Sequence, residues 1–415
     1  MAAAMRPSLK MHQNTLPRCA ISWPHSEHRG STSAYRHKTR TYGMSNNLLD
    51  PFFIPFECKS LKLTNRFAMA PMSRYFSPDG ILTQASADYY RRRIEGGLGC
   101  VITEGVAIDR PGSVAVDTVP SFFGEAGLAA WDKARIGIHA AGGAIIPQLW
   151  HVGGCEDFNY PDAPHAPLES PSGIVGPGIA GGRAMTPTDV DGVIASFVRA
   201  ALDAQRLGFD AIELHGAHGY LFDQFFWDVT NQRSDRYGGP DIADRVRFAV
   251  DVISAIRQAV GPDYAILFRI SQWKTYLYEA KIAHTPQDLE RWLVPLADAG
   301  VDIFHCSDRR FWEHAFPDHG DYNLAGWAKK VTGKPTITVG SVGLDRDLMQ
   351  DFVSGESVPS LQSLDELARR FNRGDFDLVA LGRVLLADPN WLAKVRSGRF
   401  NELRPYSKES MNELF

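Results

Sequence analysis

The chain has 415 residues, of which 44% are hydrophobic and 22% are charged. These fractions are ordinary for a globular protein and exclude a disordered, collagen-like or coiled-coil chain. The formal net charge of −4 gives no reason to expect nucleic acid or an anionic membrane as a partner.

The five cysteines, at positions 19, 58, 100, 155 and 306, are sparse and widely spaced. This pattern argues against a disulfide framework and indicates a reducing compartment, so we expect a cytoplasmic protein. The sequence has no CxxC pair, which argues against a four-cysteine zinc site or a clustered iron–sulfur motif. No stretch approaches 18 uninterrupted apolar residues, so we do not expect a transmembrane helix.

Residues 1–44 carry seven basic residues and one acidic residue, Glu27, and lack apolar periodicity. We therefore expect a disordered extension outside the fold, and two interpretations stay open. It is an organellar targeting peptide, because such peptides are rich in Arg and Ser and poor in acids, or it is a leader or upstream start before Met44. We favour the second, since folded-looking sequence follows Met44 directly. At the other end, the polar residues 405–415 predict a surface tail.

Eight short apolar runs recur from about residue 60, most of them bounded by Gly, Pro or Asp. Runs of this kind are typical of parallel strands that are buried on both faces. They comprise residues 66–70, 100–106, 144–150, 209–215, 264–270, 301–305, 336–340 and 376–381.

Amphipathic stretches between these runs predict helices over residues 83–95, 187–208, 241–261 and 285–300. Two of them begin with Thr followed by Pro, at Thr186 and Thr285, which is a typical helix start. Eight strand–helix units in sequence predict one (β/α)8 TIM barrel over residues 45–404. A doubly wound sheet has the same element count, but no GxGxxG motif follows the first run, as a dinucleotide-binding sheet would require.

In such a barrel the site lies at the C-terminal ends of the strands, and the loops after strands 7 and 8 commonly bind phosphate. Here these ends carry Gly340, Gly382 and Arg383. The glycines would let backbone N–H groups approach an anion, and the arginine would add a charged fork. The alternative is that the glycines only make tight turns and that Arg383 forms a surface ion pair.

Gln148 and Arg269 end two other strands, where they could bind a planar polar ring. An arginine that points inward is costly unless it is paired. Its partner would be an anionic cofactor or a buried carboxylate, for which Glu104 is a candidate.

His215 and His218 form an HxxH motif that Tyr220 follows. The two histidines are metal ligands, buried core residues, or donors to a substrate oxygen on which negative charge develops. Tyr220 favours the third interpretation, because a phenol beside two donors is a proton source for a carbanion or enolate.

The sixth strand ends near Ser307, followed by Arg309, Arg310 and Trp312. This loop could bind a carboxylate or phosphate of the substrate, or it is an ordinary solvated loop. We expect Cys306 to be a small buried residue and not a nucleophile.

Five stretches stand in the order and spacing of one known family: NRFAMAPM (65–72), QLWH (148–151), ELHGAHGYL (213–221), NQRSDRYGG (231–239) and LGR (381–383). On these motifs the chain resembles the Old Yellow Enzyme family of FMN-dependent ene-reductases. The resemblance implies a (β/α)8 barrel with non-covalent FMN at its C-terminal mouth and NADPH or NADH as reductant. It leaves open a monomer or a homo-oligomer.

The resemblance also implies roles for individual residues. Gln148 and Arg269 would hydrogen-bond the pyrimidine side of the flavin. The residues implied beneath and beside the ring are Pro71, Met72, Ser73 and Gly105. The residues implied at the phosphate are Gly340, Ser341, Gly382 and Arg383. Those implied at the substrate are the oxygen-binding pair His215 and His218, the proton donor Tyr220, and the pocket residues Tyr75 and Trp150.

The chain departs from the family pattern in three ways. Ser73 stands at a position that is often Thr or Cys, and the second member of the donor pair is His218 where other members have Asn. The segments 272–284 and 308–317 are not general family features, and we expect them to shape substrate choice.

The implied reaction is ping-pong. NAD(P)H passes a hydride to flavin N5 and leaves, and an α,β-unsaturated carbonyl or nitro compound takes its place and receives the hydride at its β carbon. Tyr220 then protonates the α carbon. Three alternatives stay open: an FMN-dependent amine dehydrogenase or demethylase on the same barrel, a metal-dependent hydrolase using the HxxH histidines, and a non-catalytic binding module.

Overall fold

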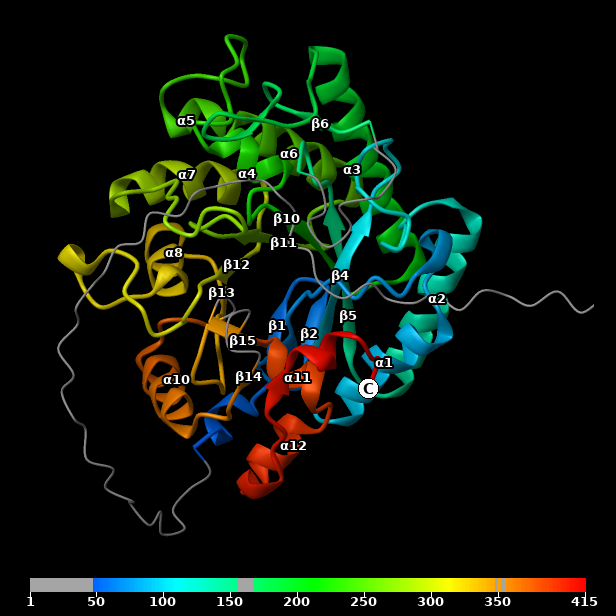
Figure 1. The fold of residues 1–415 in the computed structure, drawn as a ribbon, viewed down its shortest axis with the longest axis vertical. Coiled ribbons are helices and arrows are strands. Elements are labelled where there is room, and N and C mark those ends of the chain that lie inside the picture. The colour runs from blue at the N-terminus through cyan, green and yellow to red at the C-terminus, as the bar shows by residue number, and fades with distance from the viewer. Residues whose placement is uncertain (1–47, 156–166, 348–349, 352–355) are drawn as a thin grey trace, which may run out of the picture.

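The computed structural model describes residues 48–155, 167–347, 350–351 and 356–415. Their core is a closed barrel of eight parallel strands in the order β10-β11-β12-β13-β15-β3-β4-β5, with helices arranged around it (Figure 1). The predicted barrel is therefore confirmed, and so are all eight predicted strands, whose ends shift by at most two residues. The strands are β3 (Phe67–Met69), β4 (Cys100–Ala107), β5 (Ala144–Trp150), β10 (Ala211–His215), β11 (Ala265–Ile270), β12 (Ile303–Ser307), β13 (Thr336–Val339) and β15 (Leu378–Leu381).

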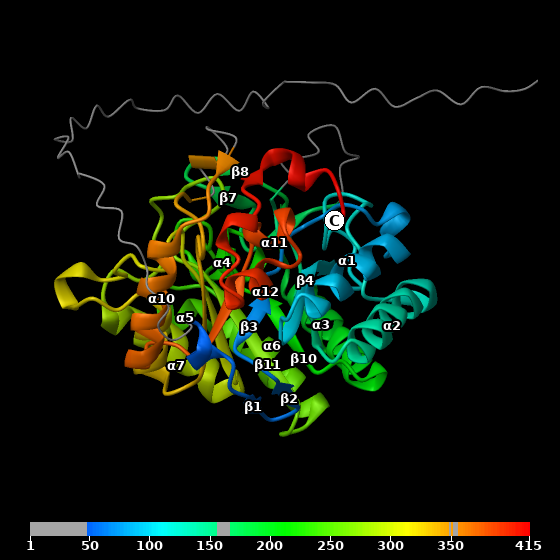
Figure 2. The ribbon, with the colours of Figure 1, turned by 90° about the horizontal axis from the view of Figure 1, so that it is seen from below.

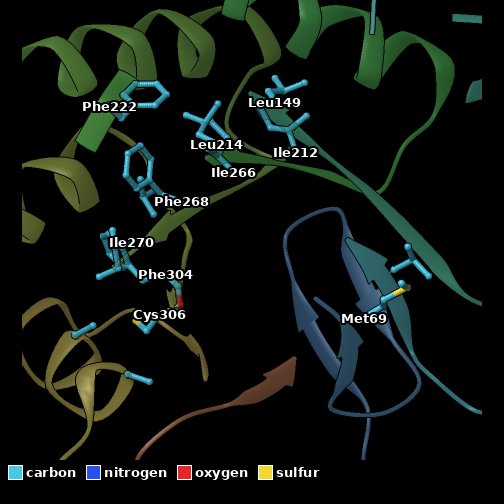
Figure 3. Close-up of a cluster of buried hydrophobic side chains, with 14 of the residues drawn as sticks. Met69, Leu149, Ile212, Leu214, Phe222, Ile266, Phe268, Ile270, Phe304 and Cys306 are labelled. Carbon is cyan, nitrogen blue, oxygen red and sulfur yellow. Dashed lines mark hydrogen bonds between the residues drawn. The ribbon is translucent and has the colours of Figure 1, made fainter. Parts of the chain in front are cut away.

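Side chains alternate between the two faces of each strand, as a period of two residues requires. On β11, Ile266, Phe268 and Ile270 point outward against the helices, where they pack with aliphatic and aromatic side chains from neighbouring strands (Figure 3). Ala265 and Leu267 belong to the separate cluster inside the barrel. Arg269 continues this inward row toward the C-terminal end, so the alternation brings a charged side chain into the mouth.

A hairpin closes the opposite end of the barrel. β1 (Phe56–Cys58) pairs with β2 (Leu61–Leu63) in antiparallel register, and Figure 2 shows the pair at the end away from the C-terminus. Phe56, Leu61 and Leu63 pack into the interior cluster of small strand residues. With one end plugged by apolar side chains, only the other end can hold a polar site.

The outer helices cover the strands on all sides (Figure 1). Three of the four predicted helices are confirmed, and the fourth, over 241–261, divides at Val246 into two helices. The helices that were not predicted are α2, α4, α8, α10, α11 and α12. The helices are α1 (Gln84–Glu95), α2 (Gly124–Ala140), α3 (Pro187–Leu207), α4 (Leu221–Phe226), α5 (Ile242–Arg245), α6 (Arg247–Val260), α7 (Pro286–Ala299), α8 (Leu324–Thr332), α10 (Leu361–Arg373), α11 (Arg383–Ala387) and α12 (Trp391–Arg396).

The predicted helix starts are confirmed at atomic level. Thr186 accepts a hydrogen bond from the backbone of Asp189, whose carboxylate accepts one in return from the backbone of Thr186. Thr285 and Asp288 form the same capping box.

Short strands and the chain end surround the mouth. β6 (Glu169–Ser170) pairs with β9 (Arg183–Ala184), and β7 (Ile174–Gly176) pairs with β8 (Ile179–Ala180). Near the C-terminus, β14 (Glu356–Ser357) pairs with β16 (Tyr406–Ser407). The remaining short helices are η1 (Asp50–Phe52), η2 (Pro78–Gly80), η3 (Pro317–His319), η4 (Phe400–Glu402) and η5 (Lys408–Met411). The interpretations offered for residues 1–44 lie outside the described residues.

Candidate active site

A cavity opens at the C-terminal mouth of the barrel, with about 1450 Å³ of empty space that includes its solvent-open entrance. The cavity volume that compares with known pockets is about 320 Å³, which lies within the range of small-molecule sites. Every residue to which the resemblance gave a role in the site lines it: Pro71, Met72, Ser73, Tyr75, Gly105, Gln148, Trp150, His215, His218, Tyr220, Arg269, Gly340, Ser341, Gly382 and Arg383. Of the loop after β12, Arg309 lines the cavity, whereas Arg310 and Trp312 do not.

The HxxH histidines and Tyr220 form one aromatic cluster. The rings of His215 and His218 lie edge to face with centroids 5.2 Å apart, and the ring of Tyr220 lies 5.0 Å from that of His215. Trp150 stands edge-on to Tyr220 at 4.9 Å. Two imidazoles and a phenol therefore converge on one part of the cavity.

Both histidines are almost fully buried, with 6% of His215 and 8% of His218 exposed. Burial lowers the pKa of each imidazole well below its usual value, and the nearby Arg269 cation lowers it further. Both rings are accordingly neutral at pH 7. A neutral imidazole carries one N–H, so each ring can donate one hydrogen bond.

The loop after β11 holds His218 in a left-handed backbone conformation with φ of 68°. The backbone N–H of His218 donates to Oγ of Ser271 at 2.9 Å, and its carbonyl accepts from Thr275. The Trp273 ring stacks on the imidazole with a centroid distance of 4.3 Å. Part of the segment 272–284 thus shapes the wall beside the donor pair, as its departure from the family pattern suggested.

Gln148 is fixed by a buried carboxylate that sequence reasoning did not select. Its Nε2 donates to Oε1 of Glu213 at 2.8 Å, and the other oxygen of Glu213 bonds Nδ1 of His305 at 2.7 Å. This leaves the carbonyl oxygen of Gln148 for a donor in the cavity. A signal for these residues existed, because Glu213 and His305 stand two positions before His215 and Ser307 and so face inward with them.

Glu104, the candidate carboxylate partner of Arg269, is engaged elsewhere. Glu104 accepts from the backbone N–H of Arg74 at 2.8 Å and from the hydroxyl of Tyr90 at 3.0 Å. The carboxylate that attracts Arg269 is that of Glu213, which faces the same interior. Burial lowers the pKa of Arg269 to about 10, so its guanidinium stays charged at neutral pH.

Arg383 lines the cavity and forms an ion pair, although this pair is not at the surface as the alternative assumed. It forms a largely buried ion pair with Asp351, and its Nη2 donates to Oγ of Ser341 at 2.9 Å. Ser341 has a positive φ of 54°. Gly340 is pinned in a conformation with φ of 145°, where a Cβ would lie 2.5 Å from the carbonyl oxygen of Asp308. The ends of β13 and β15 thus meet around a positive group.

The loop after β12 is held in place by ion pairs, in contrast to the alternative of an ordinary solvated loop. Arg309 and Arg310 each place a guanidinium nitrogen 2.9 Å from the same oxygen of Asp347, which is buried. Arg309 lines the cavity and also lies over the Tyr278 ring at 5.0 Å. Cys306 is fully buried, as expected.

Residues near the C-terminus also line the cavity, and no local sequence signal pointed to them. Tyr406 is buried, and Met411 lies beside it at the mouth. The polar tail expected over 405–415 therefore packs onto the barrel and contributes apolar wall. The side chain of Arg74 holds it, with Nη2 at 3.3, 3.3 and 2.6 Å from the carbonyl oxygens of Ser410, Met411 and Glu413.

Among residues 48–155, 167–347, 350–351 and 356–415, no group of three or more His, Cys, Asp or Glu side chains is placed to hold a metal. The two HxxH histidines therefore lack a third protein ligand within this part of the chain. None of the helices described there is long and apolar enough to span a bilayer.

A family profile described as NADH:flavin oxidoreductase / NADH oxidase matches residues 51–402. The chain belongs to this family. The resemblance to Old Yellow Enzyme proteins is thereby confirmed. The chain is 34% identical over 369 residues to 12-oxophytodienoate reductase 7 of Oryza sativa subsp. japonica, covering 83% of this chain and 88% of the relative.

Two further proteins are similar to this chain. An NADH oxidase of Thermoanaerobacter brockii is 32% identical over 355 residues, and the match covers 83% of this chain but spans only half the length of that protein. A solved structure of morphinone reductase in complex with tetrahydroNAD superposes with a TM-score of 0.70 at 25% identity, covering 87% of this chain and 93% of that one.

The cavity fits the FMN of this oxidoreductase family. Arg269 is buried with its Nε unpartnered among the described residues, and Nδ1 of His215 is likewise buried without a partner. A buried cation favours an anion beside it, and an electron-rich flavin ring would serve. The Ser341–Arg383 pair offers a hydroxyl and a guanidinium where the phosphate would lie.

We expect Arg74→Ala to weaken FMN binding roughly tenfold, because the variant releases the tail that carries the cavity residue Met411 and loses hydrogen bonds worth about 1–2 kcal/mol. Titration of the FMN-free protein with FMN, followed by flavin fluorescence, measures the change. Arg92→Ala is the control, since Arg92 donates at 2.7 Å to the carbonyl of Leu414, which does not line the cavity. Equal loss in both variants would contradict a specific role for the inner part of the tail.

The depressed pKa of His215 gives a pH prediction of definite sign. As pH falls below about 6.5 the unfolded chain binds a proton at this residue, whereas the folded protein does not. This single group therefore lowers the free energy of unfolding by about 1.4 kcal/mol per pH unit below that point, until its folded pKa is reached. Urea unfolding of His215→Asn and the parent protein at pH 7, 6 and 5 should show their stability difference shrinking or reversing with acidification. A pH-independent difference would contradict the burial argument.

Proposed function

We propose that this flavin oxidoreductase uses NADPH or NADH to reduce the activated C=C bond of α,β-unsaturated carbonyl or nitro compounds. The observation that carries the proposal is the cluster of His215, His218 and Tyr220. It places two neutral donors and a phenol beside the cavity in which Gln148 and Arg269 would hold the flavin. FMN, when bound, supplies the reversible acceptance and donation of a hydride.

In this proposal the two imidazoles donate hydrogen bonds to the carbonyl or nitro oxygen of the substrate. Negative charge grows on that oxygen as the double bond is reduced, and preorganised donors stabilise it without reorganisation. Tyr220 delivers a proton to the α carbon. Trp150 and Tyr75 form the wall beside them, and Trp150 packs so closely on Gly105 that a Cβ there would lie 2.7 Å from the indole.

The proposed flavin contacts lie in the same cavity as the donor pair. We assign the ring face to the loop after β3, through Pro71, Met72 and Ser73, and the pyrimidine side to Gln148 and Arg269. The phosphate contacts are assigned to Gly340, Ser341, Gly382 and Arg383. The neutral carbonyl oxygen of Gln148 suits a ring N–H, and the Arg269 cation suits the electron-rich reduced ring.

The names of the relatives agree with a reductase. The rice protein is named for 12-oxophytodienoate and the structural neighbour for morphinone. These substrates belong to those proteins, and we carry over only the chemical class of an activated double bond.

Anaerobic absorbance of the purified protein tests the proposal. We expect the flavin band to bleach on addition of NADPH or NADH and to return when 2-cyclohexenone is added. Bleaching without return on adding the enone, together with bleaching of a fresh sample of the oxidised protein by an N-methyl amine alone, would move the function to amine oxidation. A protein that neither contains nor binds FMN would overturn the assignment.

A further inference from the structure

Ser307 ends β12, which is separated from β10 by the single strand β11, and its side chain lines the cavity beside the donor pair. Its Oγ lies 2.9 Å from Nε2 of His218, and both side chains are more than 90% buried. The same serine accepts at its backbone carbonyl from the indole N–H of Trp273 at 3.0 Å, and Trp273 stacks on His218. One residue therefore contacts both the edge of the imidazole and the ring that covers its face.

The direction of the Ser307–His218 hydrogen bond follows from the other partners of the hydroxyl. Within the part of the chain that the structure describes, Oγ of Ser307 has no other hydrogen-bond partner. A buried hydroxyl places its proton on an acceptor where one is present. The acceptor within reach among the described residues is Nε2 of His218, and a ring that accepts at Nε2 carries its proton at Nδ1.

We propose that Ser307 is a positioning residue that holds His218 in the tautomer protonated at Nδ1, so that this N–H is the second donor to the substrate oxygen. With Nε2 engaged by Ser307, Nδ1 is the ring nitrogen that remains for a ligand in the cavity. In the opposite tautomer Nδ1 would present a lone pair to the substrate oxygen and repel it. The inference rests on the proposed function for its kinetic consequence, but the tautomer itself is independent of any substrate.

The tautomer is measured directly on the holoenzyme labelled with ¹⁵N-histidine. Two-bond ¹H–¹⁵N correlations distinguish the protonated from the unprotonated ring nitrogen, and His218→Asn identifies the signals of His218 by their loss. We expect an Nδ1–H ring in the parent protein and a shift toward Nε2–H in Ser307→Ala. Ser307→Thr keeps a hydroxyl and should retain the parent tautomer.

The kinetic test is a double-mutant cycle of Ser307→Ala and His218→Asn, with 2-cyclohexenone as the substrate. We expect Ser307→Ala to lower kcat/KM about 3–10-fold, the usual net value of one hydrogen bond, and Ser307→Thr to restore most of it. In the His218→Asn background the same Ser307→Ala change should have little effect, because an amide N–H₂ donates without choosing a tautomer. The FMN content of Ser307→Ala and the activity of Ser307→Thr show whether the alanine variant has kept its fold.

Three results would overturn the inference: an Nε2–H ring at His218 in the parent protein, a tautomer that does not respond to Ser307→Ala, or a Ser307→Ala effect that persists in full in the His218→Asn background. If the parent holoenzyme does not turn over the enone while Ser307→Ala still shifts the tautomer, the proposed substrate class fails and the pairing of Ser307 with His218 stands. If the enone is turned over and the tautomer does not respond to Ser307→Ala, the inference fails and the proposed function stands.

Discussion

Tyr220→Phe should slow the reoxidation of the reduced enzyme by 2-cyclohexenone on the order of 10²–10⁴-fold, the usual contribution of a positioned general acid. The substitution removes only the phenolic oxygen and keeps the ring, which packs against Trp150 and His215. Reduction of the bound flavin by NADPH needs no proton from this residue and should stay nearly unchanged. Anaerobic stopped-flow absorbance measures the two half-reactions separately.

Tyr278→Phe is the matched control, because it removes a phenolic oxygen from the same cavity. Tyr278 stacks on Trp273 at 5.1 Å and lies under Arg309, but it does not belong to the cluster of the donor pair. We expect a small effect on either half-reaction. An equal loss in both half-reactions of Tyr220→Phe would refute a proton donor and indicate a packing role.

The barrel could be predicted because its signals are local. Each strand is an apolar run that is buried on both faces, and each predicted helix start carries its own cap, as Thr186 and Thr285 show. The split at Val246 escaped prediction because the apolar pattern continues through it while the backbone there ends one helix and begins another.

The inner layer of the site could be predicted from strand ends, and the supporting layer could not. His215, Gln148 and Arg269 stand at positions where a barrel places functional side chains. Their partners are set by register across strands, which the order of residues along the chain does not reveal. Glu104 on β4 was a candidate partner of Arg269, but the carboxylate that attracts Arg269 is that of Glu213 on β10, the strand next to β11.

Contacts from remote segments were the least predictable. Trp273 reaches His218 from an irregular loop, and Met411 reaches the cavity from the far end of the chain. Neither position has a periodicity or motif that marks it. The hydroxyl of Ser307 stood at a predicted strand end, but its hydrogen bond to His218 depends on how the loop after β10 folds past β11 toward β12.

Replacing both donors, as in His215→Ala with His218→Ala, should abolish measurable enone reduction while the protein keeps its FMN. Removing a single preorganised donor to a developing oxyanion costs about 10²–10³ in rate. The two losses need not multiply, because the donors act on one oxygen. The FMN content of the purified variant and its kcat/KM for 2-cyclohexenone measure the two outcomes. A variant that purifies without FMN would show that the pair is structural.

His218→Asn separates loss of a donor from loss of an imidazole. An asparagine amide presents an N–H to the cavity, so the single variant should be far less impaired than His218→Ala, in which no donor remains at this position. Both variants remove the ring that Trp273 covers, and they therefore lose the same stacking contact. If the two were equally impaired, the stacked ring and not its N–H would be what the site requires, and the oxygen-binding role of His218 would be refuted.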